Sequence, residues 1–200
     1  MRLTVSALWL LLAVSFIGAQ SEEPGKNELM VWGGMSPDST TAFKVFGRTE
    51  DARFGLVSLR YSRRFNNSDV VNLKYTGDVT PIAILDFRQP FIAPEVRTST
   101  YGFGTAPFGI QAVFRPRKKV QPFVGLNGGF LYFNKQVPGV FGTHFQFTAA
   151  VEGGIDIRLK NRKAVTLGYK YFHISNGNRG IINPGIDNNV FYAGYTFFSK

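Results

Sequence analysis

The sequence has no cysteine and only two histidines in its 200 residues. Without thiols there is no disulfide framework, no thiolate nucleophile and no cysteine-ligated zinc or iron–sulfur site, and two imidazoles are too few for an all-histidine metal cage. Long apolar runs are scarce as well. After the N-terminal run 3–18, no segment reaches the roughly 18 apolar residues that mark a transmembrane helix. These absences argue against a disulfide-stabilised domain and against a helical membrane protein.

Aromatic rings and glycine are abundant instead. The chain has 20 phenylalanines, 22 glycines and 44% hydrophobic residues, a content too high for a disordered protein. A net charge of +10 raises nucleic acid or an anionic membrane surface as a partner. Only 18% of the residues are charged, however, and 15% are aromatic, which is unlike a soluble nucleic-acid binder. The position of the surplus charge has to decide between the two partners.

The N-terminal segment has the layout of a secretory signal peptide. Met1 and Arg2 form a basic region, the run 3–18 is apolar, and small residues surround Ala19. A transmembrane anchor is the alternative, but the run is shorter than the roughly 20 residues that span a bilayer, and no stop-transfer pattern follows. We expect cleavage after Ala19, so that residues 1–19 are a signal peptide and residues 20–200 form a single exported domain.

The exported part alternates between apolar and polar residues in short segments separated by turn-forming residues, which is typical of β-strands. In the segment 145–158, the odd positions are apolar or glycine, whereas Gln146, Glu152 and Asp156 lie at even positions. The same pattern gives eight candidate strands: 28–35, 53–62, 71–81, 108–115, 124–132, 145–158, 164–175 and 191–197.

A soluble β-sandwich would also alternate, but two features favour a membrane barrel. The apolar face is unusually aromatic, and the polar face carries charge and glycine, as the lumen of a small barrel would. Closure of the sheet also removes edge strands that would otherwise aggregate. The sequence therefore predicts an all-β fold, an eight-stranded antiparallel transmembrane β-barrel of the bacterial outer membrane. We expect a charge-paired plug in its lumen, made of Arg60, Lys74, Asp78, Glu152, Asp156 and Lys170.

The connections between these strands are alternately long and short. The short ones are 65–69, 116–119 and 159–163, and the long ones are 37–52, 86–99, 134–142 and 176–188. Bacterial barrels have short periplasmic turns and longer extracellular loops, so both termini are expected in the periplasm. Phe197 and Phe198 resemble the terminal aromatic signal that the barrel-assembly machinery recognises, which makes that machinery an expected partner.

Basic residues flank the three short turns: Arg63, Arg64, Arg115, Arg117, Lys118, Lys119, Arg158, Lys160, Arg162 and Lys163. In the predicted topology this charge faces the inner leaflet, where anionic headgroups attract it. The high net charge therefore indicates outer-membrane lipids, and not nucleic acid, as the partner.

The seventh candidate strand ends in two polar residues on its apolar face. His173 and Ser175 continue the parity of Tyr169 and Tyr171, and positions i and i+2 of a strand lie ~7 Å apart on one face. Such a pair can form an acyl-transfer nucleophile with the histidine as general base. The alternative interpretation is two polar residues where a strand leaves the membrane.

The segment that follows contains candidate partners for this pair. Asp187 is the only carboxylate of the loop 176–188, and a carboxylate bonded to the far imidazole nitrogen would fix its tautomer. The Asn183 amide or a nearby backbone N–H can donate to an oxyanion. An ordinary turn at Asn183 and a solvated charge at Asp187 are the alternatives.

The motif His173-Ile174-Ser175-Asn176-Gly177, followed by Asn183-Pro184-Gly185 and then Asp187, resembles the outer-membrane lipid A 3-O-deacylases, the PagL-like members of the acyloxyacyl hydrolase group. Segments 75–81 and 102–109 resemble the middle strands of that family. The resemblance implies a lipid-facing triad that hydrolyses the 3-position ester of lipid A, with lipopolysaccharide as substrate and no metal or organic cofactor. It makes Ser175 the nucleophile and His173 the base, with Asn183, Asn176 and Gly177 as oxyanion and substrate contacts.

One departure from the family concerns the acid, because the family has glutamate where this chain has Asp187. The shorter side chain is expected to reach His173 only if the loop backbone moves inward. The other imidazole, His144, is expected at the barrel rim. Two other functions stay open on the sequence: a non-enzymatic small barrel with an adhesive or structural role, and a phospholipase or acyltransferase that uses the same residues.

Overall fold

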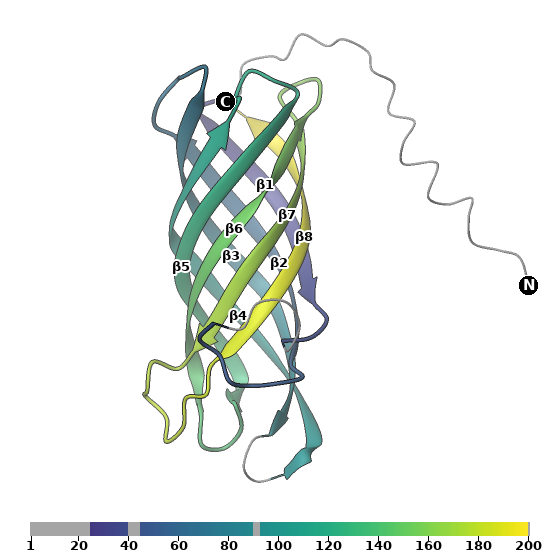
Figure 1. The fold of residues 1–200 in the computed structure, drawn as a ribbon, viewed down its shortest axis with the longest axis vertical. Helices are drawn as coiled ribbons and strands as arrows, with labels where there is room; N and C mark the ends of the chain where they lie inside the picture. Colours follow the sequence, from purple (N-terminus) through teal and green to yellow (C-terminus); the bar gives the residue numbers. More distant parts are fainter. Residues whose placement is uncertain (1–24, 40–44, 90–92, 200) are drawn as a thin grey trace, which may run out of the picture.

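The computed structural model describes residues 25–39, 45–89 and 93–199, so the predicted signal peptide 1–19 lies outside the described residues. The strands are β1 (Asn27–Ser36), β2 (Arg53–Arg64), β3 (Val71–Gln89), β4 (Ala93–Phe114), β5 (Val120–Val137), β6 (Thr143–Arg158), β7 (Ala164–Ser175) and β8 (Ile186–Ser199). Each strand pairs antiparallel with the next, and β1 pairs with β8 to close the barrel (Figure 1). The predicted fold class is confirmed. Within the described ranges, no helix is long and apolar enough to cross a membrane.

The alternation of the sequence sorts side chains between the two faces of the barrel wall. On β2, Val57 and Leu59 are 44% and 50% exposed, whereas Ser58 and Arg60 between and beside them are buried. Similar exposed apolar side chains occur on the other strands, among them Val79, Tyr101, Leu126, Val151, Leu167 and Phe191. An apolar wall of this extent is the surface that a transmembrane barrel presents to lipid.

The lumen is filled by paired charges. Arg60 bonds both Asp78 and Glu152, and Lys170 contacts Glu152 from the other side. Nearer the chain termini, Glu28 pairs with Lys74 and Arg158. Burying charges is favourable only when they are paired and hydrogen-bonded in this way. The expected plug residues are all buried, so this prediction is confirmed.

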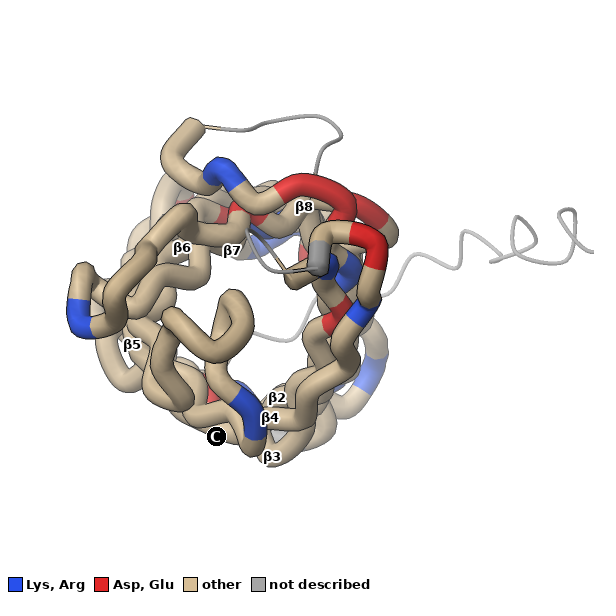
Figure 2. Tube along the Cα trace, turned by 90° about the horizontal axis from the view of Figure 1, so that it is seen from below, with Lys and Arg blue, Asp and Glu red and all other residues tan. Residues whose placement is uncertain are grey.

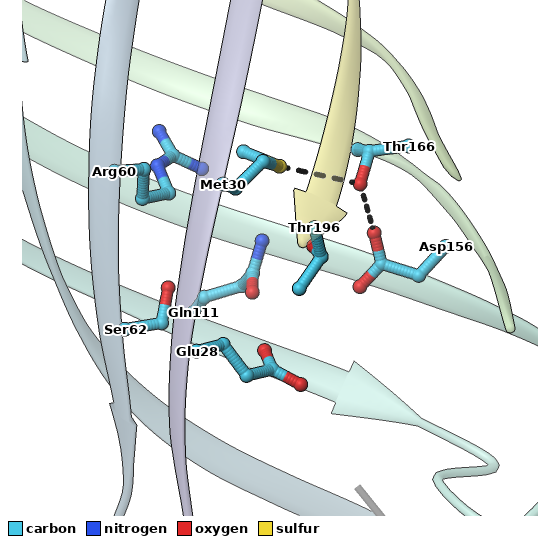
Figure 3. A pocket seen from close by; sticks show the side chains of 8 residues that line it. All are labelled: Glu28, Met30, Arg60, Ser62, Gln111, Asp156, Thr166 and Thr196. Atoms are coloured by element: carbon cyan, nitrogen blue, oxygen red, sulfur yellow. Dashed lines mark hydrogen bonds between the residues drawn. The ribbon is translucent and has the colours of Figure 1, made fainter. Parts of the chain in front are cut away.

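Between these two groups of charges lies a void of about 20 Å³, lined by Glu28, Met30, Arg60, Ser62, Gln111, Asp156, Thr166 and Thr196 (Figure 3). The Asp156 carboxylate accepts a hydrogen bond of 2.6 Å from the Thr166 hydroxyl there. The void has room for about one water molecule. The lumen here is thus a packed interior of paired polar and charged side chains.

Several strands are longer than the sequence indicates. The expected loop 86–99 is mostly strand, because β3 continues to Gln89 and β4 begins at Ala93. Ionic and hydroxyl contacts hold this extension together: Asp86 accepts hydrogen bonds from Arg97 and Ser99. The pattern of alternating apolar residues ends where the strand leaves the apolar band, so it does not report the polar continuation of the ladder.

The two ends of the barrel differ. The end that carries the C-terminus has the three short turns, and we call it the turn end; the other, with the longer connections, is the loop end (Figure 1). Seen from the loop end, most acidic positions gather on one side of the barrel, whereas basic positions lie both among them and on the other sides (Figure 2). One of the ten basic residues assigned to the turns is placed wrongly by the sequence, because the Arg158 side chain is buried and pairs with Glu28 in the lumen.

Candidate active site

The adjacent ends of β7 and β8, at the loop end, bring His173 and Asp187 together. The two residues are direct register partners in the antiparallel ladder, and Nδ1 of His173 lies 2.6 Å from Oδ1 of Asp187. The expectation that Asp187 lies in a loop is wrong, since it is the second residue of β8. Facing cross-strand residues have Cβ atoms about 5 Å apart, so the short aspartate side chain reaches the ring without an inward movement of the loop.

Asp187 is held by a segment that is far away in the sequence. Its Oδ2 accepts hydrogen bonds from three consecutive backbone N–H groups, those of Val45, Phe46 and Gly47, at 2.8, 2.9 and 2.8 Å. Consecutive N–H groups that converge on one oxygen form an anion-binding nest. The carboxylate is therefore bonded on both oxygens, and Asp187 is only 1% exposed although it lies on the outer face of the barrel.

Two more backbone bonds fix the nest against the connection that precedes β8. The N–H groups of Arg48 and Thr49 donate to the carbonyl oxygens of Pro184 and Gly185 at 2.7 and 3.1 Å. The Phe46 ring lies edge-on to the imidazole of His173, with centroids 5.7 Å apart. Residues 45–49, which we call the clamp, thus cover Asp187 and one edge of His173.

Two glycines make this close packing possible. A Cβ on Gly47 would lie 2.6 Å from the backbone nitrogen of Asp187 and 2.9 Å from its carboxylate. Gly185 has a φ of +65°, and a Cβ there would lie 2.9 Å from Cε1 of His173. Contacts below 3.0 Å cannot be relieved by backbone atoms without a shift of the chain. Both positions are therefore restricted to glycine by the imidazole–carboxylate pair.

Ser175 lies at the end of β7, and its hydroxyl contacts the side chain of Asn183. The Ser175 Oγ–H donates to Oδ1 of Asn183 at 3.1 Å, and Nδ2 of Asn183 lies 3.0 Å from Oγ. The Gly177 N–H donates to the same Oγ at 3.2 Å. The side-chain amide of Asn176 donates to the Ile182 carbonyl, and its backbone N–H donates to Oδ1 of Asn183.

The hydrogen bonds of the Ser175 hydroxyl run to Asn183 and Gly177, not to His173. The structure thus contains an Asp187–His173 pair and a Ser175–Asn183 pair on adjoining positions of one face. Catalytic hydrogen bonds in ligand-free structures are often absent and form when substrate binds. The arrangement supplies a base with a fixed tautomer, a hydroxyl and two N–H donors within one wall of the barrel.

The wall beside Ser175 is apolar. Phe147 of β6 is the register partner of Ser175 and is 45% exposed. Ala149 and Val151 continue this exposed face away from the loop end. The Phe130 and Phe145 rings stack with their centroids 5.3 Å apart, and Phe145 meets Phe147 edge-on with a centroid distance of 5.1 Å. The Arg179 guanidinium lies over two of these rings, 5.7 Å from the Phe145 centroid and 5.8 Å from the Phe147 centroid. The wall beside Ser175 is therefore aromatic and aliphatic, with one cation over the rings.

The other sequence candidates lie elsewhere. His144 is half-buried at the loop end, where its Nδ1 lies 2.9 Å from the Phe133 carbonyl oxygen and its ring stacks on Tyr132. No group of three or more histidine, aspartate or glutamate side chains in the described ranges is arranged to hold a metal ion. The clamp is the element that sequence reasoning missed, and the only signal for it is the glycine at position 47.

The clamp leads to a prediction for Gly47→Ala. The new Cβ displaces Asp187 and its three N–H donors, so we expect kcat for ester hydrolysis to fall on the order of 10²-fold with little change in KM. Gly55→Ala on the neighbouring β2 is the matched control, because a Cβ there meets its nearest atom at 3.8 Å. The low-field N–H proton resonance of His173 should be lost in Gly47→Ala and kept in Gly55→Ala. Equal rates for the two variants would contradict a positioning role of the clamp.

The fold and the site together define an eight-stranded outer-membrane β-barrel with a serine, a histidine and a carboxylate on its outer wall. A family model described as "Lipid A 3-O-deacylase (PagL)" matches residues 58–196. The match covers well over half of the chain, and the protein belongs to the lipid A 3-O-deacylase (PagL) family. The clamp of this chain, residues 45–49, lies before the matched range.

Comparison with solved structures gives one match with a TM-score above 0.5, which agrees on the fold, and further matches with lower scores. A crystal structure of the outer membrane enzyme PagL matches with a TM-score of 0.60 at 14% identity, over 82% of this chain and 97% of that one. Neisserial surface protein A matches with a TM-score of 0.48 at 12% identity, over 88% and 98% of the two chains. OprG from Pseudomonas aeruginosa matches with a TM-score of 0.49 at 12% identity, over 90% and 99%. A search of curated proteins finds no match.

Proposed function

We propose that the protein is an outer-membrane esterase that removes the acyl chain at the 3-position of lipid A, with Ser175 as nucleophile. The observation that carries the proposal is the 2.6 Å contact between His173 and Asp187 on the outer wall, two residues along β7 from Ser175. A buried carboxylate that is hydrogen-bonded to an imidazole is unexpected on a wall that otherwise presents apolar side chains to lipid, so a chemical role has to account for it. Family membership supplies that reason.

The protons in the site have defined positions. An ionised carboxylate can only accept hydrogen bonds. The nitrogen of His173 that faces Asp187 is Nδ1, so neutral His173 carries its ring proton there. Nε2 then carries the lone pair and is free to accept a proton. A turn of the Ser175 side chain away from Asn183 brings Oγ toward Nε2, and this movement is expected when the ester enters the site.

The proposed reaction has two halves. Ser175 Oγ attacks the ester carbonyl carbon while its proton passes to Nε2 of His173, and the imidazolium is stabilised by Asp187. The tetrahedral intermediate collapses when the bond to the sugar oxygen breaks and that oxygen takes the proton from His173. Water, deprotonated by His173, then attacks the carbonyl carbon of the acyl–Ser175 ester, and the bond to Ser175 Oγ breaks as Oγ takes the proton back from His173 and the fatty acid is released. Free serine is regenerated.

The oxyanion of this intermediate requires donors beside Ser175. The Asn183 amide and the Gly177 N–H already lie 3.0 and 3.2 Å from Oγ, and a donor of this kind contributes on the order of 10²- to 10³-fold in kcat. Asn176 supports Asn183 through its backbone N–H and fixes the loop through its bond to Ile182. We assign it a positioning role in place of a direct contact with substrate.

The proposal includes the orientation and processing of the chain. Removal of residues 1–19, insertion by the barrel-assembly machinery and termini in the periplasm place the loop end at the outer leaflet, where lipopolysaccharide resides. Ser175 then lies at the depth of the ester bonds, with the acyl chain against Phe147 and Val151.

The test uses purified protein in detergent micelles with lipid A as substrate. We expect one free fatty acid per lipid A and a product that has lost only the 3-position ester, both measured by mass spectrometry. An acylated acceptor in place of free fatty acid would identify a transferase, and release from phospholipid alone a phospholipase. Unchanged lipids of every class would contradict the enzyme and favour a structural or adhesive barrel.

A further inference from the structure

The clamp has a second face, which lines a cavity at the loop end. This cavity of about 880 Å³ is bounded by the clamp and the residues after it, by the β3–β4 hairpin and by the segment before β8; its lining includes Phe46, Arg48, Glu50, Arg88 and Asn183. Ligand pockets for small molecules have volumes of roughly 300–1,000 Å³. The cavity is thus large enough for one or two sugar rings.

The cavity adjoins the reacting groups. Asn183 lines it and is also hydrogen-bonded to Ser175 Oγ. Phe46 lines it and contacts the ring of His173. A molecule whose ester lies at Ser175 therefore has its polar part next to the cavity, while its acyl chain follows the apolar wall beside Phe147 in the other direction.

The charges of the cavity are unequally satisfied. Asp51 accepts hydrogen bonds from Arg88 at 2.6 Å and from Arg97 at 2.8 Å. The hydrogen bond from Arg88, together with the charge of Arg97, lowers the pKa of Asp51. Arg97 also pairs with Asp86, so both arginines have carboxylate partners within the protein. Arg48 differs: its backbone N–H is bonded to Pro184, but its exposed guanidinium has no ion-pair partner in the part of the chain that the structure describes.

We propose that this cavity binds the phosphorylated amino-sugar headgroup of the lipid substrate, with the Arg48 guanidinium on a phosphate. Arginine matches phosphate geometry with two parallel N–H donors. A guanidinium without an ion-pair partner in the protein can bind an external anion without first breaking an internal ion pair. Arg48 is also part of the clamp: it directly follows Gly47, whose backbone N–H donates to the carboxylate of Asp187, and its own N–H donates to the Pro184 carbonyl. The inference rests on the proposed function, because it names the part of that substrate which the cavity recognises.

The test measures binding, so that it does not depend on turnover. The chain carrying Ser175→Ala, in detergent micelles, is titrated with phosphorylated lipid A, with dephosphorylated lipid A of the same acylation, and with inorganic phosphate. Arg48→Ala added to that chain should weaken binding of phosphorylated lipid A by roughly 10- to 100-fold and leave the dephosphorylated lipid unchanged. Lys135→Ala, which removes an exposed positive charge at the loop end outside the cavity, is the matched control and should change neither.

The outcomes separate this inference from the proposed function. An equal loss on both lipids, or no loss on either, would overturn the assignment of Arg48 whether or not the wild-type chain hydrolyses lipid A. Binding of inorganic phosphate as tight as that of the lipid would replace the headgroup site with a free-anion site. Conversely, Arg48→Ala could weaken binding of the phosphorylated lipid alone while the wild-type chain hydrolyses no lipid A. That result would support the headgroup site and contradict the proposed esterase activity. The heat-dependent electrophoretic mobility of each variant verifies that its barrel is folded.

Discussion

Replacing Ser175 or His173 by alanine is expected to lower the rate of lipid A hydrolysis on the order of 10⁴- to 10⁶-fold. Each change removes one half of the same proton transfer, so the double replacement should lower the rate no further. The measurement is kcat for fatty acid release by purified protein in micelles. The rate of the double variant is the informative measurement, because two independent structural defects would reduce the rate by the product of their separate effects.

The chain provides its own control for the histidine. It has one other imidazole, His144, which is half-buried at the same end of the barrel and bonded to the Phe133 carbonyl. His144→Ala should retain wild-type kcat within a small factor. If both histidine variants lose activity to the same degree, the loss reflects the loop end as a whole and the role of His173 as base is contradicted.

Asp187→Asn is expected to reduce kcat by about 10⁴-fold with an unchanged KM. The three N–H donors of Val45, Phe46 and Gly47 require an acceptor at Oδ2. The amide oxygen therefore takes that place, and the NH₂ group is turned toward Nδ1 of His173. The histidine must then accept at Nδ1 and carry its proton on Nε2, where it is no longer a base for Ser175.

Asp86→Asn is the matched control for this change. Asp86 is another loop-end carboxylate, and its partners are Arg97 and Ser99 of the β3–β4 hairpin. Full activity in Asp86→Asn together with a large loss in Asp187→Asn would show that the loss comes from the changed hydrogen bond to the His173 imidazole. Retention of more than about a tenth of wild-type kcat in Asp187→Asn would instead indicate a Ser–His dyad without a working acid.

The sequence predicts the barrel well because the physical rule behind it is local. A strand in a membrane must place apolar side chains outward at every second residue, and that period is visible on each strand without knowledge of its partners. The same parity identifies the lumen charges and places His173 and Ser175 outside. It fails where the rule stops applying, as in the polar extension of β3 and β4 beyond the apolar band.

The site is only partly predictable from the sequence, for a related reason. Residues 173–187 lie within one hairpin, so their proximity follows from a short stretch of chain. The clamp is about 140 positions away from Asp187 and acts through backbone N–H groups, which carry no side-chain signature. Whether the short side chain of Asp187 can reach His173 likewise depends on strand register. The ladder places Asp187 directly opposite His173, whereas a residue in a loop would need a longer side chain.

The central claim, that Ser175 and its partners remove one acyl chain from lipid A in the outer membrane, is tested most directly by lipid A from living cells. Cells that produce the wild-type chain and cells that produce Ser175→Ala, at equal amounts of folded barrel, are compared by mass spectrometry of their extracted lipid A. We predict a population that lacks the 3-position acyl chain with the wild-type chain and none with Ser175→Ala. Identical lipid A from the two strains, or the same acyl loss in both, would contradict it.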